Sequence, residues 1–507
     1  MARVLTNNTS LQVGIQPTGL DSTPLFWKML EPNTISTLGA DISTVVRTPI
    51  SKNRQRQAGT ITDLDSAFEY DGDLTMDEFG EFIEGFSFAI FTGPVASQSG
   101  ANFDNLSAVL ATSAFAHDAF AAALLVNHLV FTRAFATAAN NGLWMVSGVP
   151  TTILTPCNAT PIGAANDADD IVNETPSEEL QARMDVCGYQ FQDLVWTTAT
   201  STLSSAAALM DTVGLTVGQI LRVGDADAAT QFPLGDFFGR VVTIAAGSVV
   251  LDKLTDIGVG TQVGTNGASD IVNVLFGRFL RNVSVDDSDF IERYFQFEAA
   301  WDDLGGIGTP EYEYSLNNLC NQLTFNLPIA DKAGLTFGFI GTDTEVPTTS
   351  RKSGASTPVQ AVQTEAFNTT SDIARLRVTE ADETGISTDF KSITITVNNN
   401  VSPEKVVGTL GAAFMNTGNF EVDIESQLVF TDSTIITAIR NNTTVTMEWI
   451  INNNDGGFAV DIPSMKLGGG GKELPVNESV LISFTGAAFE DATLGYSMSV
   501  SIFPYLP

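Results

Sequence analysis

The chain has 507 residues, of which 43% are hydrophobic and 16% charged, and its 59 acidic and 24 basic residues give a formal net charge of −35. This length predicts two or three domains, because a single core stops growing at roughly 250 to 300 residues. The acidic balance disfavours free nucleic-acid binding, since affinity for phosphates requires clustered Lys and Arg.

Cysteine usage and hydropathy predict a protein that folds in a reducing compartment. Cys157, Cys187 and Cys320 form no C-x-x-C pair, so neither a disulfide framework nor a zinc site is expected. Residues 1–8 lack the apolar segment of a signal peptide. The most apolar stretch, residues 119–131, is shorter than the roughly 20 residues that span a bilayer. We therefore expect folding in a cytoplasm and no membrane anchor.

Short β-branched runs separated by Thr, Asn, Gly and Ser predict a mainly β fold. Residues 393–397 and 498–502 alternate strictly between apolar and polar side chains, which is typical of half-buried antiparallel strands. A further strand is predicted over residues 420–425. One face of that strand is apolar, and the other carries Glu421, Asp423 and Glu425.

Two short amphipathic helices are predicted. The first begins at Thr75, which forms a capping box with Glu78. Its apolar stripe consists of Met76, Phe79, Phe82, Ile83 and Phe86. The second begins near Asp432, a favourable N-cap residue. Its stripe consists of Ile435, Ile436 and Ile439. Each stripe is expected to cover a sheet.

The order of elements around the two helices predicts an internal duplication. The helices follow similar strings, at residues 68–71 (FEYD) and 420–423 (FEVD), and a long polar connection precedes each string, at residues 47–60 and 398–417. Further strands follow each helix: 295–301 and 323–339 in the first half, and 445–451, 457–462, 480–488 and 496–503 in the second. We interpret this shared order as two copies of a β-domain that carries one short helix.

A long block, roughly residues 93–273, separates the first helix from its later strands and is interpreted as an insertion. Residues 215–223 and 239–251 predict a small β-barrel or sandwich within it. The Ala-rich segment at residues 106–125 is either helical or a packed connection.

The sequence contains no recognisable catalytic or metal-binding motif. His117 and His128 do not have a metal-ligand spacing and are interpreted as core or surface residues. The glycine run at residues 467–473 lacks the Ser or Thr of a phosphate loop and predicts a flexible hairpin loop. The protein is therefore expected to be no enzyme and to need no cofactor or metal.

Charge is unevenly distributed near the N-terminus. Four basic residues lie within ten positions: Arg47, Lys52, Arg54 and Arg56. The segment that follows is acidic: Asp63, Asp65, Glu69, Asp71, Asp73 and Asp77. Head-to-tail stacking of identical subunits uses such complementary signs. Pairing of the two segments within one chain is the alternative.

Several segments resemble tail tube proteins of long-tailed bacteriophages. In the N-terminal part they are residues 23–33, 46–55 and 62–65, and in the C-terminal part 400–404, 410–418 and 493–500. The resemblance covers most of residues 1–95 and 275–507, and the insertion is matched only loosely, at residues 140–143 and 215–219.

The resemblance implies a ring-forming β-sandwich or barrel whose rings stack into a tube that conducts DNA during ejection. Duplication lets three chains build a ring of six tube domains, and a ring of six chains is the alternative. It also implies partners at the tail tip and the head, DNA passage without specific binding, and a non-contractile siphovirus-type tail assembled in the host bacterial cytoplasm.

The expected domains are a discontinuous first tube domain (1–97 and 275–345), an inserted decoration domain (98–274) and a second tube domain (346–507). Arg47, Lys52, Arg54 and Arg56 are expected to contact the neighbouring ring. The acidic residues of both halves are expected to face the channel or a complementary surface: Asp63, Asp65, Glu69, Asp71, Asp73, Glu421, Asp423 and Glu425.

Two other classes of function compete with the structural one. A carbohydrate-binding or decoration protein of the virion surface needs exposed aromatic platforms, whereas the five Trp residues are scattered along the chain. An acidic glycosidase needs two working carboxylates, and so acidic a chain offers no basis for choosing them.

Overall fold

The computed structural model describes residues 9–16, 19–20, 22–24, 27–50, 55, 57–76, 80–92, 107–109, 114–116, 124–133, 135–148, 157–161, 183–206, 210–225, 230, 232–233, 235–252, 271–302, 309–356, 358–361, 364–380, 385–387, 389–431 and 433–507. These residues form a mainly β protein, as the alternating sequence predicts.

A first set of strands forms half of the body. It comprises β1 (Thr9–Gln16), β2 (Trp27–Leu30), β3 (Thr34–Val46), β4 (Gly59–Asp73), β18 (Tyr294–Trp301), β19 (Glu311–Leu327) and β20 (Gly334–Gly341). The strands pair antiparallel in the order β2-β1-β18-β19-β20-β4-β3.

A second set repeats this topology. It comprises β22 (Ile373–Glu380), β23 (Gly385–Ser387), β24 (Phe390–Asn398), β27 (Glu421–Val429), β28 (Thr444–Asn453), β29 (Gly456–Glu473) and β30 (Leu481–Ala488). The pairing order is β23-β22-β28-β29-β30-β27-β24. Each strand of the first set thus has a counterpart at the same place in the chain order and in the pairing order of the second.

The two sets join into one continuous sheet. The second half of β19 pairs with β20 on one side and with β24 on the other, from Gln322 opposite Asn398 to Leu327 opposite Ile393. The resulting eight-stranded sheet has the order β3-β4-β20-β19-β24-β27-β30-β29. This sheet is the frame on which the candidate site is built.

One short helix packs on each strand set: α1 (Gly80–Ser87) on the first and α2 (Thr434–Asn441) on the second. The Phe82 ring of α1 lies 5.3 Å from the Phe295 and Phe337 rings and 5.6 Å from the Phe339 ring, measured between centroids. In α2, Ile435 is buried in the same core, and Ile436 and Ile439 pack against it. Both predicted stripes therefore face the core where they are described.

The predicted start of the first helix is not tested, because residues 77–79, directly before the first described residue of α1, lie outside the described residues. Thr75 and Met76 are not helical, and the Leu74 N–H donates to the Ala333 carbonyl, 2.9 Å away, which extends the sheet pairing. Glu78 and Phe79 lie outside the described residues, as does Asp432, so neither predicted cap is tested. Ser433 occupies the N-cap position of α2.

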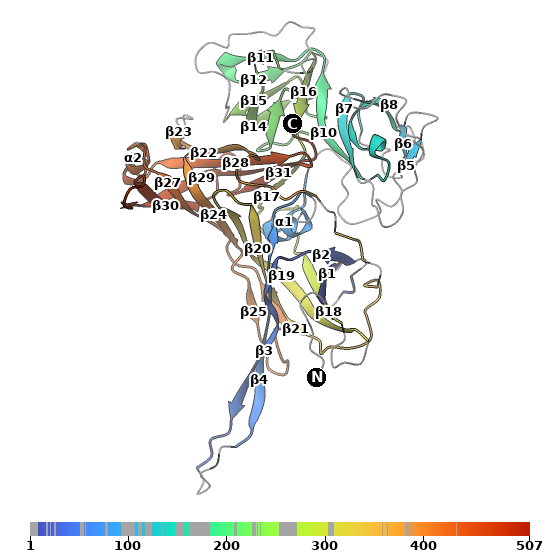
Figure 1. The fold of residues 1–507 in the computed structure, drawn as a ribbon, viewed down its shortest axis with the longest axis vertical. Helices are drawn as coiled ribbons and strands as arrows, with labels where there is room; N and C mark the ends of the chain where they lie inside the picture. Colours follow the sequence, from blue (N-terminus) through green and yellow to red (C-terminus); the bar gives the residue numbers. More distant parts are fainter. Residues whose placement is uncertain are drawn as a thin grey trace.

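The insertion contains the strands β5 (Ser107–Val109), β6 (Ala114–Ala116), β7 (His128–Arg133), β8 (Gly142–Gly148), β9 (Cys157–Pro161), β10 (Arg183–Phe191), β11 (Val195–Thr197), β12 (Thr202–Ser204), β13 (Ile220–Val223), β14 (Phe237–Ala245), β15 (Ser248–Asp252) and β16 (Val272–Leu275). They form one sheet in the order β11-β12-β15-β14-β13-β16-β10-β7-β8-β9-β6-β5. The insertion and the long β3–β4 hairpin lie at opposite ends of the molecule (Figure 1).

Three further expectations are corrected. The Ala-rich segment is not helical where it is described, because β5 and β6 are strands there. Residues 323–339 are two strands, β19 and β20, joined by a turn. The glycine run belongs to β29, with a bulge between Gly469 and Gly471. Gly470 has φ +90°, a conformation that favours glycine. The side chains of Ile436 and Ile439 of α2 pack against its Cα.

Other predicted strands are confirmed. Residues 393–397 lie in β24, residues 421–425 in β27, and 499–502 in β31 (Ser499–Phe503). β31 pairs with β29 and with β17 (Arg278–Arg281), which follows the insertion in the chain. In β27 the apolar residues Val422 and Ile424 are buried and the acidic residues between them are exposed.

Candidate functional site

The acidic residues of both halves project from one face of the eight-stranded sheet. From Leu64 onward every second side chain of β4 is buried, and Asp63, Asp65, Glu69, Asp71 and Asp73 occupy the alternate positions on the other face. The same alternation exposes Glu421, Asp423 and Glu425 of β27. Because strand side chains alternate with a period of two, each series shares one face.

Strand register aligns these carboxylates in rows across the sheet. Asp71 lies opposite Thr336, Thr336 opposite Thr324, Thr324 opposite Thr396, and Thr396 opposite Asp423. The second row runs from Asp73 through Gly334, Asn326 and Thr394 to Glu425, and the third from Glu69 through Gly338, Gln322 and Asn398 to Glu421. Only uncharged residues separate the acidic residues in each row.

The opposite face of the sheet is closed by the hydrophobic core. Phe337, Phe325, Ile395 and Ile424 belong to the same buried cluster as Phe82 of α1 and Ile435 of α2. The helices therefore cover the apolar face, and no helix of the described residues covers the acidic face, called here the acidic sheet face.

The two outer strands of the sheet have unpaired edges. In the described residues, the one strand partner of β3 is β4. β29 pairs with β30 as far as Glu473, but its pairing with β28 ends at Lys466. Unpaired edges of this kind are templates for pairing with another chain. Within the chain, the counterparts of these two strands, β24 and β19, pair with each other.

Two hairpins project from the same end of the sheet. We call the β3–β4 hairpin with its connection the first arm, and the hairpin of β25 (Ser402–Glu404) and β26 (Phe414–Asn416) the second arm. The Lys405 ammonium of the second arm lies 2.6 Å from a carboxylate oxygen of Asp63 and 2.6 Å from one of Asp65. The hydrogen bond from Lys405 lowers the pKa of Asp63.

The predicted basic cluster is described only in part. Arg47 lies exposed at the start of the connection of the first arm, whereas Lys52, Arg54 and Arg56 lie outside the described residues. The acidic residues Asp63 and Asp65 do have a basic partner within the chain, but it is Lys405. Sequence reasoning missed this residue, although it is the one basic residue in the polar connection at 398–417.

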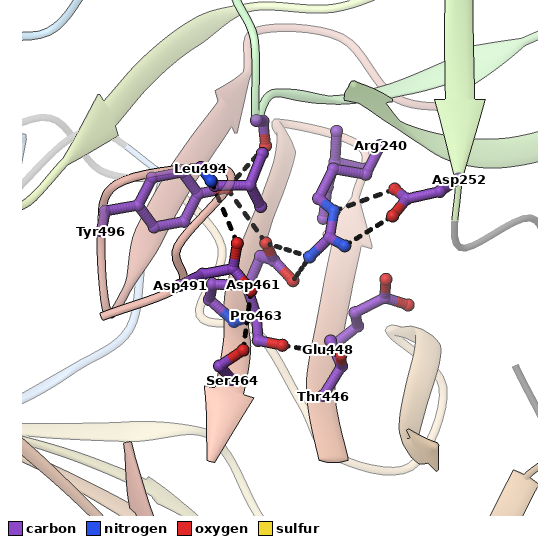
Figure 2. Close-up of polar contacts among 12 residues, drawn as sticks. Arg240, Asp252, Thr446, Glu448, Asp461, Pro463, Ser464, Asp491, Leu494 and Tyr496 are labelled. Carbon is purple, nitrogen blue, oxygen red and sulfur yellow. Dashed lines mark hydrogen bonds and ion pairs between the residues drawn. The ribbon is translucent and has the colours of Figure 1, made fainter. Parts of the chain in front are cut away.

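The insertion is fixed to the second strand set by a buried ion-pair network (Figure 2). The Arg240 guanidinium, on β14, donates to both oxygens of Asp252 at 3.0 and 2.7 Å and to Asp461 of β29 at 3.3 and 3.1 Å. The Tyr496 hydroxyl also donates to Asp461, at 3.2 Å. Arg240 is 6% exposed and Asp461 is 1% exposed, so these charges are compensated inside the protein.

Burial controls the ionisation of this network. Burial raises the pKa of Asp461 to about 6, against the opposing attraction of Arg240. Burial lowers the pKa of Arg240, but Asp461 and Asp252 outweigh it and raise that pKa overall. Next to Asp461, Glu448 of β28 accepts charged hydrogen bonds from Arg375 and Arg377 at 2.6 and 2.9 Å.

Other titratable groups of the described residues have structural roles. His128 is buried, accepts a hydrogen bond from the Leu125 N–H and contacts the Val213 carbonyl through Nε2, and burial lowers its pKa to about 4. His117 lies outside the described residues. A search of the described part of the chain finds no group of His, Cys, Asp and Glu suited to a metal ion, and no helix there is long and apolar enough to cross a membrane.

Comparison with known families identifies the chain. The family model described as phage tail tube protein matches residues 6–488, so the chain belongs to that family. No curated protein matches the sequence. The structural role in the phage tail that the residues suggested is thus supported by nearly the whole length of the chain.

Proposed function

We propose that this member of the phage tail tube protein family forms rings of three chains that stack into the tail tube, with the acidic sheet face lining the DNA channel. The observation that carries the proposal is the alignment of Glu69, Asp71 and Asp73 with Glu421, Asp423 and Glu425 in shared rows of one sheet.

The repeated topology supports a ring of three chains. Each chain supplies two equivalent groups of four strands, and the link between the groups, β19 with β24, is already made within the chain. The edges of β29 and β3 remain unpaired in this sheet, and these two strands are the counterparts of β19 and β24. Pairing β29 of one chain with β3 of the next closes the ring by the same type of contact.

The size of such a ring suits a channel. Three copies of an eight-stranded sheet make a barrel of about 24 strands, more than the 16 to 18 strands that already leave an aqueous channel in porins. The helices and the apolar core then lie outside the channel wall. The insertion, held on Asp461 in the first half of β29, lies away from the acidic sheet face and decorates the outside.

The charge of the face explains passage without binding. Phosphate binding requires clustered Lys and Arg, whereas the three rows carry carboxylates separated by hydroxyl, amide and glycine residues. A duplex inside such a wall is repelled from all sides and finds no basic site at which to stop. The first arm, with Arg47, points along the strand direction and is placed to contact the neighbouring ring. Proteins of the tail tip and head complete the tube.

The test is negative-stain electron microscopy of the purified full chain over a series of concentrations and salt conditions, with mass photometry of the same samples. Hollow rings or tubes and a dominant species of three chain masses are expected. A ring of six chains contradicts the stoichiometry. A monomer under every condition, together with retention on a glycan array, contradicts the tube and favours a surface-binding protein.

A further inference from the structure

Residues 504–507, called here the C-terminal segment, cross from the second strand set onto the insertion. They follow β31, and the C-terminus lies between β31 and the insertion strands β14 and β16 (Figure 1). Pro504 and Leu506 are buried, and Tyr505 and Pro507 are partly buried. A segment that is covered in this way belongs to a contact between two parts of the chain.

Tyr505 packs into an apolar cluster of the insertion. Its ring stacks on the Phe131 ring of β7, with 5.6 Å between the centroids. The buried members of the cluster are Leu129, Leu143, Cys187 and Leu275. The Tyr505 hydroxyl lies 3.5 Å from a carboxylate oxygen of the buried Asp225, and burial raises the pKa of this hydroxyl. The insertion thus holds a side chain that another part of the chain supplies.

Leu506 joins the insertion to the second strand set. It is 3% exposed and belongs to a cluster with members from both sides: Ile220 and Phe238 of the insertion, and Ile450, Ala459 and Phe503 of β28, β29 and β31. The Leu506 carbonyl accepts a hydrogen bond from the Asn452 amide of β28, at 3.1 Å. The Arg222 guanidinium of β13 donates to the main-chain oxygen of Pro507. Adjacent residues of the segment are therefore bound to opposite sides of the boundary.

The apolar contact between the insertion and the strand sets runs through this segment. In the described residues, two hydrophobic clusters combine insertion residues with residues beyond Gly277. Tyr505 belongs to one of them and Leu506 to the other. The ion pair of Arg240 and Asp461 adds a polar anchor. The insertion is thus held at an apolar point and at a polar point.

The chain leaves the insertion next to the C-terminal segment. A Cβ atom at Gly277 would overlap the Ile502 carbonyl oxygen and the Cδ atom of Pro504, so the backbone there touches β31 where the segment begins. Arg278, the next residue, pairs with Ile502. The segment therefore starts at the point about which the insertion can pivot, and its later residues bind the insertion beyond that point.

We propose that the C-terminal segment is a latch: Tyr505 and Leu506 hold the insertion against the second strand set, and release of the segment lets the insertion undock while the strand sets stay folded. The main core of the described strand sets contains neither of these residues and no residue of the insertion, so undocking leaves that core intact. The inference concerns a single chain and does not depend on the proposed ring.

Two native cysteines report on the latch. Cys187 is fully buried in the Tyr505 cluster, and burial raises the pKa of its thiol, so a maleimide reaches it only when that cluster opens. Cys320 is equally buried in the main core and reports on unfolding of the strand sets. The purified full chain is incubated with N-ethylmaleimide, and mass spectrometry of its peptides gives the labelling rate of each cysteine.

Two variants weaken the docking away from Cys187. Leu506→Ala truncates a member of the other cluster, and we expect Cys187 labelling to become about tenfold or more faster. Asp461→Asn weakens the polar anchor, and we expect an increase of about fivefold or more, because an undocking insertion carries Cys187 away from Tyr505. The Cys320 rate is expected to stay at the wild-type value in both.

Two controls accompany these variants. Tyr505→Phe keeps the ring and is expected to label Cys187 at nearly the wild-type rate. Leu474→Ala removes a leucine that is 76% exposed on the β29–β30 turn and is expected to change neither rate. An unchanged Cys187 rate in Leu506→Ala or in Asp461→Asn overturns the latch. Equal acceleration of Cys187 and Cys320 also overturns it, because the insertion and the strand sets then open as one unit.

Discussion

Asp71 of β4 and Asp423 of β27 lie in one row of a single sheet, joined through Thr336, Thr324 and Thr396. They belong to the two similar strings at residues 68–71 and 420–423, and each is the last residue of its string. The repeat therefore places carboxylates at regular intervals across one sheet. Three threonines between them keep the row polar without adding positive charge.

Reversing charge on the acidic sheet face is expected to make assembled tubes retain DNA. Glu421→Lys with Asp423→Lys replaces two exposed carboxylates of β27 with ammonium groups, so phosphates gain a basic site that weakens with salt. Nuclease protection of linear duplex, measured on tubes at low and high salt, is expected to rise for this variant. Asp289→Lys, at an exposed site on the β17–β18 connection, is the control. Equal retention by the control contradicts a channel position.

Cross-linking between the two unpaired edges is expected to stop at three chains. In a chain with Cys157→Ala, Cys187→Ala and Cys320→Ala, Thr34→Cys on β3 and Gly468→Cys, beyond the β28 pairing of β29, lie at opposite edges of the sheet, roughly 30 Å apart by strand spacing. A bismaleimide too short for that span joins them only between chains.

Denaturing gels are expected to show dimers and closed trimers. Each single-cysteine variant serves as a control and gives no trimer. Bands up to six chains indicate the larger ring, and monomers alone in samples that contain rings exclude the β3–β29 contact.

Truncation of Phe82 is expected to destabilise the protein strongly. Its ring is 2% exposed and packs among four aromatic rings of β18 and β20, so Phe82→Ala leaves a cavity and costs about 3–5 kcal/mol. Thr437→Ala, at an exposed position of α2, is expected to change stability by about 0.5 kcal/mol or less. Urea unfolding followed by tryptophan fluorescence measures both. Similar midpoints for the two variants contradict the packing described for α1.

Substitution of Asp461 is expected to weaken the docking of the insertion. Asp461→Asn replaces one carboxylate oxygen by an amide NH2 group, which cannot accept the hydrogen bonds from Arg240 and Tyr496, while Arg240 keeps its pair with Asp252, so the cost at neutral pH is expected to be about 1–2 kcal/mol. The folded pKa of Asp461 is raised to about 6, so its contribution to stability is full below the unfolded pKa and is lost as pH rises through 6. The difference in Tm between wild type and variant is therefore expected to be larger at pH 5 than at pH 7.5. A difference that shrinks at pH 5 contradicts this assignment.

Local alternation made much of the strand content predictable. The period of two in residues 393–397 and 421–425 is a property of neighbouring residues, and it gave both the strands and their acidic or apolar faces. The helical stripes were predictable for the same reason. The hydrogen bond from Leu74 to Ala333 was not, because it depends on a strand that lies far along the chain.

Strand register and the contact between the insertion and the second strand set could not be predicted from sequence patterns. The row that contains Asp71 and Asp423 depends on four successive strand pairings, and a shift of one residue in any of them changes the face. The insertion interrupts the first strand set in the chain, yet Arg240 pairs with Asp461 in the second, 221 residues away. The role of Lys405 could not be predicted from sequence either, because only the fold brings this loop residue close to Asp63 and Asp65.

A cryo-electron microscopy map of tubes assembled from the full chain tests the central claim most directly. The account predicts three chains per ring, an unbroken β-barrel around the channel, and the side chains of Asp71 and Asp423 on its inner surface. A channel lined by the insertion or by α1 and α2, with these two carboxylates on the outside, contradicts it.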